Sequence, residues 1–144
     1  MKPLLLILFV TLSIPSSILA TDHSDLETVI NSYFEFWSDQ NMKDYRSLFS
    51  KSARIDFRSK SGMIQSENLE DFIDSQTQSH IFSPVPMKEI PLEKKITIGK
   101  DIAQVMVYWK LTAGKRVVKG WDFFVLNKEG GTWKIIYLIF QNEN

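Results

Sequence analysis

The spacing of apolar residues predicts helices at the start of the folded domain. These residues recur at intervals of three and four positions, as on one face of a helix: Leu26, Val29, Ile30, Tyr33 and Trp37. Ser24 and Glu27 have the spacing of a capping box, so the first helix is predicted over Asp25–Asp39. Asn41 is a candidate cap for a second, shorter helix that ends near 50–52.

The period then changes to two. Ala53, Ile55 and Phe57 alternate with polar residues, which predicts a half-buried strand. A third helix is predicted from about Leu69 to Ser79, with Ser66 or Asn68 as cap, and residues 83–86 end it because they hold two prolines.

From Met87 onward the chain is predicted to form strands joined by short turns. The turns contain glycine at 99–101, 114–115 and 129–131, and connections of this kind favour antiparallel hairpins. Helices in one part of the chain and strands in another indicate an α+β fold, with the helices on one face of the sheet. Some strands are apolar on both faces, as with Val105 and Val107 against Met106 and Tyr108. A symmetric dimer would cover the second face.

The amino terminus has the order of a secretory signal peptide. Lys2 precedes an apolar run over residues 4–14, and Pro15, two serines and Ala20 follow as a cleavage region. The run is shorter than the ~20 residues that span a bilayer. We therefore expect cleavage near Ala20, a secreted or periplasmic protein without stable membrane insertion, and a single domain over 21–144.

Composition excludes several kinds of partner and site. Without residues 1–20 the chain has 16 basic and 17 acidic residues, and this balance gives no electrostatic signature for nucleic acid. The sequence contains no cysteine, which excludes disulfides and thiol catalysis. Nucleophile-elbow, P-loop and HExxH motifs are absent, and no cofactor is expected.

The domain resembles a known superfamily. The aromatic segment 33–37, the segment 45–49, the predicted 96–107 hairpin and above all the closing segment 124–135 are similar to the NTF2-like superfamily, in its SnoaL-like and DUF4440-type branches. The resemblance covers 21–144. It implies a cone-shaped fold, in which a curved antiparallel sheet is wrapped by about three N-terminal helices, with a pocket at the open end and frequent dimerisation. Members include isomerases, cyclases, dehydratases and binding modules, so the fold leaves function open.

Asp122 is the main candidate for chemistry. It interrupts the apolar run 121–126, and a carboxyl facing the cone interior would have a raised pKa and suit proton abstraction next to a carbonyl. On a strand end it would instead pair with Lys119, Arg116 or water. Asp56 fits a solvated ladder of alternating charge, and His80 fits a helix end.

Aromatic residues are candidates for the pocket wall. The predicted pocket residues are Tyr33, Trp37, Tyr108, Trp121 and Tyr137, although most aromatics must simply belong to the core. Trp109 is a further aromatic of this kind. If cleavage follows Ala20, His23 becomes the third residue, and such a terminus binds Cu(II) or Ni(II) in a square-planar site.

Three functions follow from these patterns. The first is binding of a small apolar or carbonyl-bearing molecule in the cone pocket. The second is an isomerase, cyclase or dehydratase in which Asp122 is the base and Tyr33 or Tyr108 a hydrogen-bond donor, although the sequence pairs no second acid with Asp122. The third is a homodimeric interaction module without a small ligand.

Overall fold

The computed structural model describes residues 16–143, so the apolar run of the predicted signal peptide lies outside the described residues. Its elements, in chain order, are α1 (Ser16–Ser38), α2 (Met42–Ser47), β1 (Phe49–Arg58), β2 (Ile64–Asn68), α3 (Leu69–Phe82), β3 (Met87–Ile98), β4 (Ile102–Ala113), β5 (Arg116–Glu129) and β6 (Thr132–Asn142). The predicted order is confirmed, with β2 added. Within the described part of the chain, no helix is long and apolar enough to cross a membrane.

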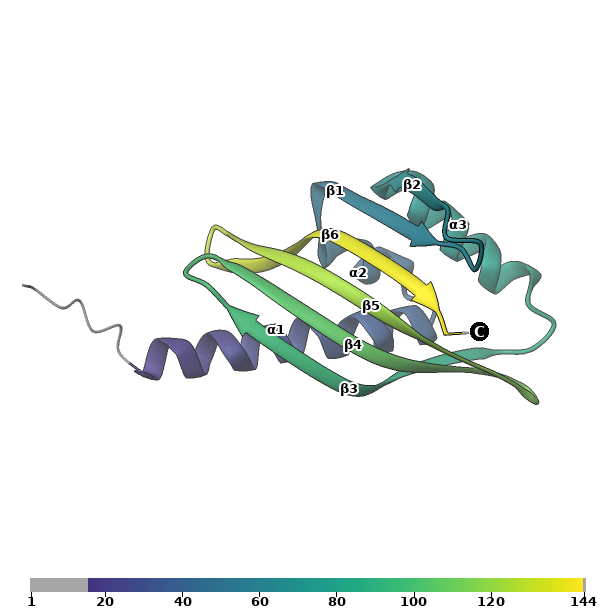
Figure 1. The fold of residues 1–144 in the computed structure, drawn as a ribbon, viewed down its shortest axis with the longest axis horizontal. Helices are drawn as coiled ribbons and strands as arrows, with labels where there is room; N and C mark the ends of the chain where they lie inside the picture. Colours follow the sequence, from purple (N-terminus) through teal and green to yellow (C-terminus); the bar gives the residue numbers. More distant parts are fainter. Residues whose placement is uncertain (1–15, 144) are drawn as a thin grey trace, which may run out of the picture.

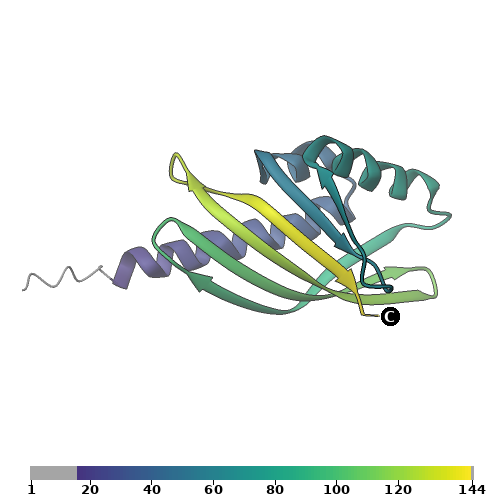
Figure 2. The same ribbon diagram turned by 45° about the horizontal axis from the view of Figure 1, so that its top comes forward.

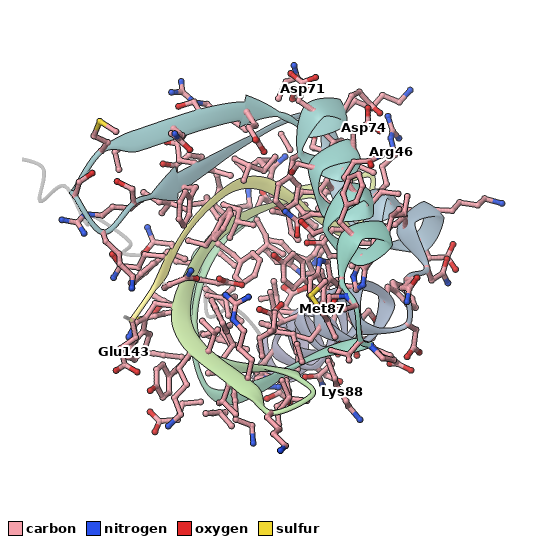
Figure 3. The ribbon with its side chains drawn as sticks, turned by 90° about the vertical axis from the view of Figure 1, so that its right-hand side faces the viewer. Arg46, Asp71, Asp74, Met87, Lys88 and Glu143 are labelled. Carbon is pink, nitrogen blue, oxygen red and sulfur yellow. The ribbon has the colours of Figure 1, made fainter. Side chains whose placement is uncertain are left out.

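One six-stranded sheet has the order β2-β1-β6-β5-β4-β3. Strands β3 to β6 form the predicted antiparallel meander, whereas β1 and β6 are parallel. No tight turn links β1 to β6, so their direction is not restricted to antiparallel. The three helices lie on one face of the sheet (Figures 1 and 2), and the sheet curves around the interior when viewed along its strands (Figure 3). This is the predicted α+β cone.

Alternation along the strands separates an inner from an outer face. On β4, Ala103, Val105, Val107 and Trp109 are buried, while the residues between them are partly or fully exposed. The core packs between the inner face and the helices, where Leu26 and Ile30 of α1 and Leu138 of β6 are fully buried. Each large apolar side chain buried in this way contributes about 1.5–3 kcal/mol.

Helix α1 begins at Ser16, so the predicted capping box at Ser24 is wrong. Ser24 lies inside the helix, and its carbonyl accepts a hydrogen bond from Thr28 Oγ1 at 3.0 Å. Tertiary contacts stabilise the helical residues before Ser24. Asp22 is only 5% exposed, pairs with Lys128 and accepts a hydrogen bond from Trp133 Nε1 at 3.3 Å. A local capping signal cannot reveal such contacts.

The other helix starts follow the sequence more closely. Asn41 caps α2 and accepts a hydrogen bond from the amide of Asp44 at 3.3 Å, and Asn68 caps α3 through the amide of Asp71 at 3.0 Å. Helix α3 continues to Phe82, just before the Pro84 segment. Strand β2 escaped prediction because all its residues are exposed, which leaves no apolar alternation to detect.

Candidate functional site

A cavity of about 450 Å³ lies between the inner face of the sheet and helices α1 and α3. Most of its wall is apolar or aromatic. The lining residues are Tyr33, Trp37, Phe72, Gln76, Ser79, Phe82, Ser83, Pro84, Met87, Glu89, Trp109, Leu111, Arg116, Val118, Asp122, Phe140 and Asn142. In the view along the strands, Met87 points toward this interior and Lys88 away from it (Figure 3). A concave, mainly apolar cavity with a few polar groups is the usual form of a small-molecule site.

Asp122 is the buried polar group of this cavity. It follows the inward position Gly120 on β5, so the two-residue period places its carboxyl inside the cone, where it is only 3% exposed. Its Oδ1 accepts a hydrogen bond from Trp109 Nε1 at 2.6 Å. Burial raises the pKa of the carboxyl to about 8, although the indole hydrogen bond lowers it. The acid is therefore mainly protonated at neutral pH.

Gly120 makes room for the indole that binds Asp122. Gly120 and Trp109 are directly opposite each other on β5 and β4. A Cβ atom at position 120 would lie 2.3 Å from Cζ2 of Trp109 and 2.4 Å from the carbonyl oxygen of Gln141. Only glycine fits beneath this ring, so the sequence Gly120-Trp121-Asp122 supplies both the acid and the space for its partner.

Glu89 is a second acid on the cavity wall, so the expectation that Asp122 has no acidic companion is wrong. It lies on β3 opposite Leu111 of β4 and is half-buried. Burial raises its pKa well above the usual range, and the nearby Asp122 charge raises it further. Two negative charges in one apolar cavity are unfavourable, so this pair retains at least one proton at neutral pH.

The remaining predicted aromatics divide between the two faces of the sheet. Tyr33 and Trp37 line the cavity, and burial raises the pKa of the Tyr33 hydroxyl, which therefore stays a hydrogen-bond donor. The placement of Tyr108, Trp121 and Tyr137 in the pocket is wrong. All three lie on the outer face. Tyr108 and Trp121 are offset by one residue from the inward positions Trp109 and Asp122. On β6 a register shift between Ile135 and Tyr137 interrupts the alternation, so that Leu138 points inward and Tyr137 outward.

The outer aromatics have partners of their own. The Tyr108 hydroxyl donates to Glu143 Oε2 at 2.7 Å, and its ring lies 4.7 Å from that of Trp121. The Tyr137 hydroxyl donates to Asp56 Oδ2 at 2.7 Å. Tyr108 therefore cannot assist Asp122 across the sheet, whereas Tyr33 remains on the same side.

Asp56 is more buried than a solvated charge ladder requires. It is 6% exposed, and its Oδ1 lies 3.5 Å from Arg54 Nε. Hydrogen bonds, first from Ser66 and then from Tyr137, lower the pKa of this carboxyl. Because it lies on the outer face, Asp56 belongs to a structural cluster away from the cavity.

The two histidines are not part of the cavity wall. The ring of His80 lies 4.3 Å from that of Trp37, and burial lowers its pKa. His23 is exposed on α1, and its metal site stays a prediction that depends on cleavage after Ala20. Among residues 16–143, no group of three or more acidic or histidine side chains is arranged to hold a metal ion.

Comparison with known proteins identifies a family for this chain. Residues 21–141 match a family described as "Putative lumazine-binding". No curated protein sequence is significantly similar to the chain.

Solved structures share the fold at low sequence identity. An NTF2-like protein of unknown function from Shewanella baltica is 19% identical with a TM-score of 0.68, over 87% of this chain and 96% of that one. An NTF2-like protein of unknown function from Pseudomonas putida is 10% identical with a TM-score of 0.74, over 85% and 87%. A protein from Novosphingobium aromaticivorans, described as "Putative Scytalone Dehydratase", is 11% identical with a TM-score of 0.75, over 90% of this chain and 89% of that one. At such identities the likeness concerns the fold alone.

The predicted superfamily is thus confirmed, whereas a SnoaL-like or DUF4440-type branch stays a prediction. The chain belongs to the NTF2-like superfamily and, by its match over residues 21–141, to the family described as "Putative lumazine-binding".

Proposed function

We propose that this domain binds a small, largely apolar molecule with a carbonyl group in the cone cavity. The observation that carries this proposal is the buried Asp122 carboxyl on a cavity wall made mostly of aromatic and aliphatic side chains. The same proposal includes export of the domain with cleavage near Ala20, as the N-terminal sequence predicts.

The protonation state of Asp122 determines the preferred ligand group. A carboxyl with a pKa of about 8 is neutral at pH 6.5 and donates an O–H to an acceptor. Oδ1 already accepts from Trp109, and Oδ2 has no hydrogen-bond partner among the described residues. A ligand carbonyl can accept from Oδ2. The family description names lumazine, a flat bicyclic heterocycle whose two carbonyl groups are acceptors of this kind, although its ring nitrogens make it more polar than the proposed ligand.

Matched ketone and hydrocarbon probes test this proposal. 2-Acetylnaphthalene and 2-ethylnaphthalene have nearly the same shape, but only the first has a carbonyl. Trp37 and Trp109 line the cavity, so quenching of tryptophan fluorescence reports binding. At pH 6.5 we expect the ketone to bind about tenfold more tightly, the equivalent of one net hydrogen bond.

Two results would contradict the binding proposal. The first is equal affinity for both probes, and the second is failure of either probe to saturate the quenching. Asp122→Leu removes the donor at similar volume and should abolish the ketone preference. Asp74→Leu on the exposed side of α3 is the matched control and should retain it.

Acid–base catalysis is the second candidate function, favoured by Glu89 on the same cavity wall as Asp122. Two acids with raised pKa values provide a carboxylate and a carboxylic acid in one cavity. The ionised member can remove a proton next to a bound carbonyl while the protonated member donates to the carbonyl oxygen. In D₂O, wild-type protein should then accelerate deuterium incorporation into the methyl group of 2-acetylnaphthalene, and Asp122→Asn should not. Equal incorporation with both proteins would refute catalysis by Asp122.

A homodimer through the outer face remains a further proposal. Met106, Phe123, Tyr137 and Ile139 line a groove there, with Lys95, Thr97 and Gln104 as its polar residues, and Phe123 is 40% exposed. A second copy would cover the apolar side chains of this groove. Sedimentation should show a dimer that Phe123→Glu dissociates, while Met63→Glu at the exposed β1–β2 turn leaves it intact. A monomeric wild type at high concentration would refute the dimer.

Export is tested by the mass of the released chain. Expressed at full length in a bacterial host, the protein should be recovered outside the cytoplasm with a mass that begins at Thr21. Recovery of the uncleaved chain from the cytoplasm would contradict export.

A further inference from the structure

The charges on the cavity wall are unevenly distributed. Glu89 and Asp122 have raised pKa values and together hold at least one proton at neutral pH. Arg116 is the single basic residue among the cavity-lining side chains. An arginine keeps its charge at any physiological pH. The cavity therefore combines an acidic inner site, which disfavours a second negative charge, with a fixed positive charge elsewhere on its wall.

Arg116 lies at the rim of the cavity. It is the first residue of β5, directly after the Gly114–Lys115 turn, and it is exposed. The turn contacts the connection between α3 and β3, since a Cβ atom on Gly114 would lie 3.5 Å from Val85. Figure 1 shows the β4–β5 turn and the C-terminal end of α3 at the same end of the molecule. Arg116 forms no ion pair with any residue in the described part of the chain.

The hairpin that bears Arg116 is strongly basic. Residues 110–121 contain Lys110, Lys115, Arg116 and Lys119 and no acidic residue. The last two turns of α3 and the segment to Pro86 bring no lysine, arginine, aspartate or glutamate to the opposite side of the rim. Glu143 is a nearby acid, since its amide donates to the Lys119 carbonyl at 2.8 Å, but the four basic residues of the hairpin give this rim a local positive potential.

The separation between Arg116 and Asp122 sets the shape of a molecule that contacts both. They lie on the same side of β5, six positions apart, which corresponds to about 20 Å along a strand. The flexible arginine side chain shortens this gap. Leu111, Val118 and Phe82 line the cavity together with them, and Phe82 is 78% exposed. An apolar chain fits such a wall, whereas a compact polar solute does not.

We propose that the ligand is an elongated amphiphilic anion. Its carbonyl end lies against Asp122, its apolar body contacts the cavity wall, and its carboxylate pairs with Arg116 at the rim. This inference rests on the proposed binding function, because it assigns a ligand class to the same cavity. Arg116 is then a specificity residue that selects acids over neutral ketones.

A pair of probes that differ in one terminal group tests this inference. 9-Oxodecanoate and 2-decanone have the same ketone and the same number of carbons, but a carboxylate in the first replaces a methyl group in the second. Their affinities are measured by displacement of bound 2-acetylnaphthalene, so that only binding in the same cavity is detected. We expect 9-oxodecanoate to bind about tenfold more tightly at low salt, and the preference to shrink as sodium chloride is added.

Substitutions locate the source of the preference. Arg116→Gln should abolish the tenfold preference by weakening the binding of 9-oxodecanoate, while Arg116→Lys should restore part of the preference. Lys115→Gln, a neighbouring cation outside the cavity wall, should keep most of it. Preference retained in Arg116→Gln, or lost equally in Lys115→Gln, would overturn the inference.

The two proposals fail in different ways. If 2-acetylnaphthalene and 2-decanone bind but 9-oxodecanoate has no advantage in the wild type, the anion inference is wrong and the binding function stands. If none of the three binds, the binding function itself is wrong, and the anion inference falls with it.

Discussion

Asp122 should make the stability of this protein depend on pH in a way that one substitution removes. In the folded protein its pKa is about 8, whereas the ordinary value is 3.8. Between these two values the unfolded chain has lost the proton and the folded chain retains it. Stability therefore falls as pH rises, by about 1.4 kcal/mol per pH unit. Below pH 4 both states are protonated, and the contribution of Asp122 to stability is fully present.

Asp122→Asn keeps the size of the side chain and an oxygen that can accept from Trp109, but it does not titrate. From pH 5 to pH 7 the wild type should lose about 3 kcal/mol of unfolding free energy relative to this variant, as expected for two pH units of a fully buried acid. His80 titrates in both proteins, so its contribution cancels in the difference. The Asp122 charge raises the pKa of Glu89, so the difference reports the titration of Asp122 together with its effect on Glu89.

Urea unfolding followed by tryptophan fluorescence at pH 5, 6 and 7 measures this difference. Asp74→Asn, at an exposed position on α3, is the control and should follow the wild type. Parallel pH profiles for wild type and Asp122→Asn would refute the reasoning, because they would mean that the Asp122 carboxyl is already ionised in the folded protein at pH 5.

Three further substitutions test the framework around the site by urea unfolding. Gly120→Ala should lower the free energy of unfolding by about 1–3 kcal/mol and alter Trp109 fluorescence, because the new methyl group overlaps the indole. An unchanged urea midpoint would contradict the close contact. Asp22→Ala should lower the free energy of unfolding by about 1–3 kcal/mol, because it leaves Lys128 and the Trp133 indole without their acceptor. Asp25→Ala on the exposed side of α1 should change the free energy of unfolding little. Asn68→Ala should cost about 1 kcal/mol by removing the cap of α3, and a loss below a few tenths would show that the cap contributes nothing.

The sequence predicted the fold wherever burial has a regular period. Helix α1, the meander β3–β6 and the caps Asn41 and Asn68 all follow from local patterns. The pattern could not reveal β2, whose residues are all exposed, or the early start of α1 at Ser16. The latter depends on Asp22 reaching Lys128, more than 100 residues away, and such a contact has no local signature.

The candidate site was predictable only in part. Asp122 stands out because an acid interrupts an apolar strand, and alternation already places Trp121 on the opposite side from it. The same alternation separates Tyr108 from Trp109, so Tyr108 and Trp121 could have been excluded from the pocket by the period alone. Tyr137 could not, because it lies two residues from the buried Ile135, and only the register shift in β6 turns it outward. Glu89 could not have been found in this way, because it lies 33 positions before Asp122 on a different strand, and only the curvature of the sheet brings β3 to the same cavity.

The two faces of β5 can be substituted independently of each other. Gly120 and Asp122 face the cavity, and Trp121 and Phe123 face the exterior, so a substitution in one set leaves the other face unchanged. Insertion or deletion of a single residue between the turn and Asp122 has a different effect, because it shifts the register of the strand. Such a change would turn the acid outward and an aromatic ring inward at once. New chemistry in this cavity can therefore arise by substitution but not by insertion or deletion within β5.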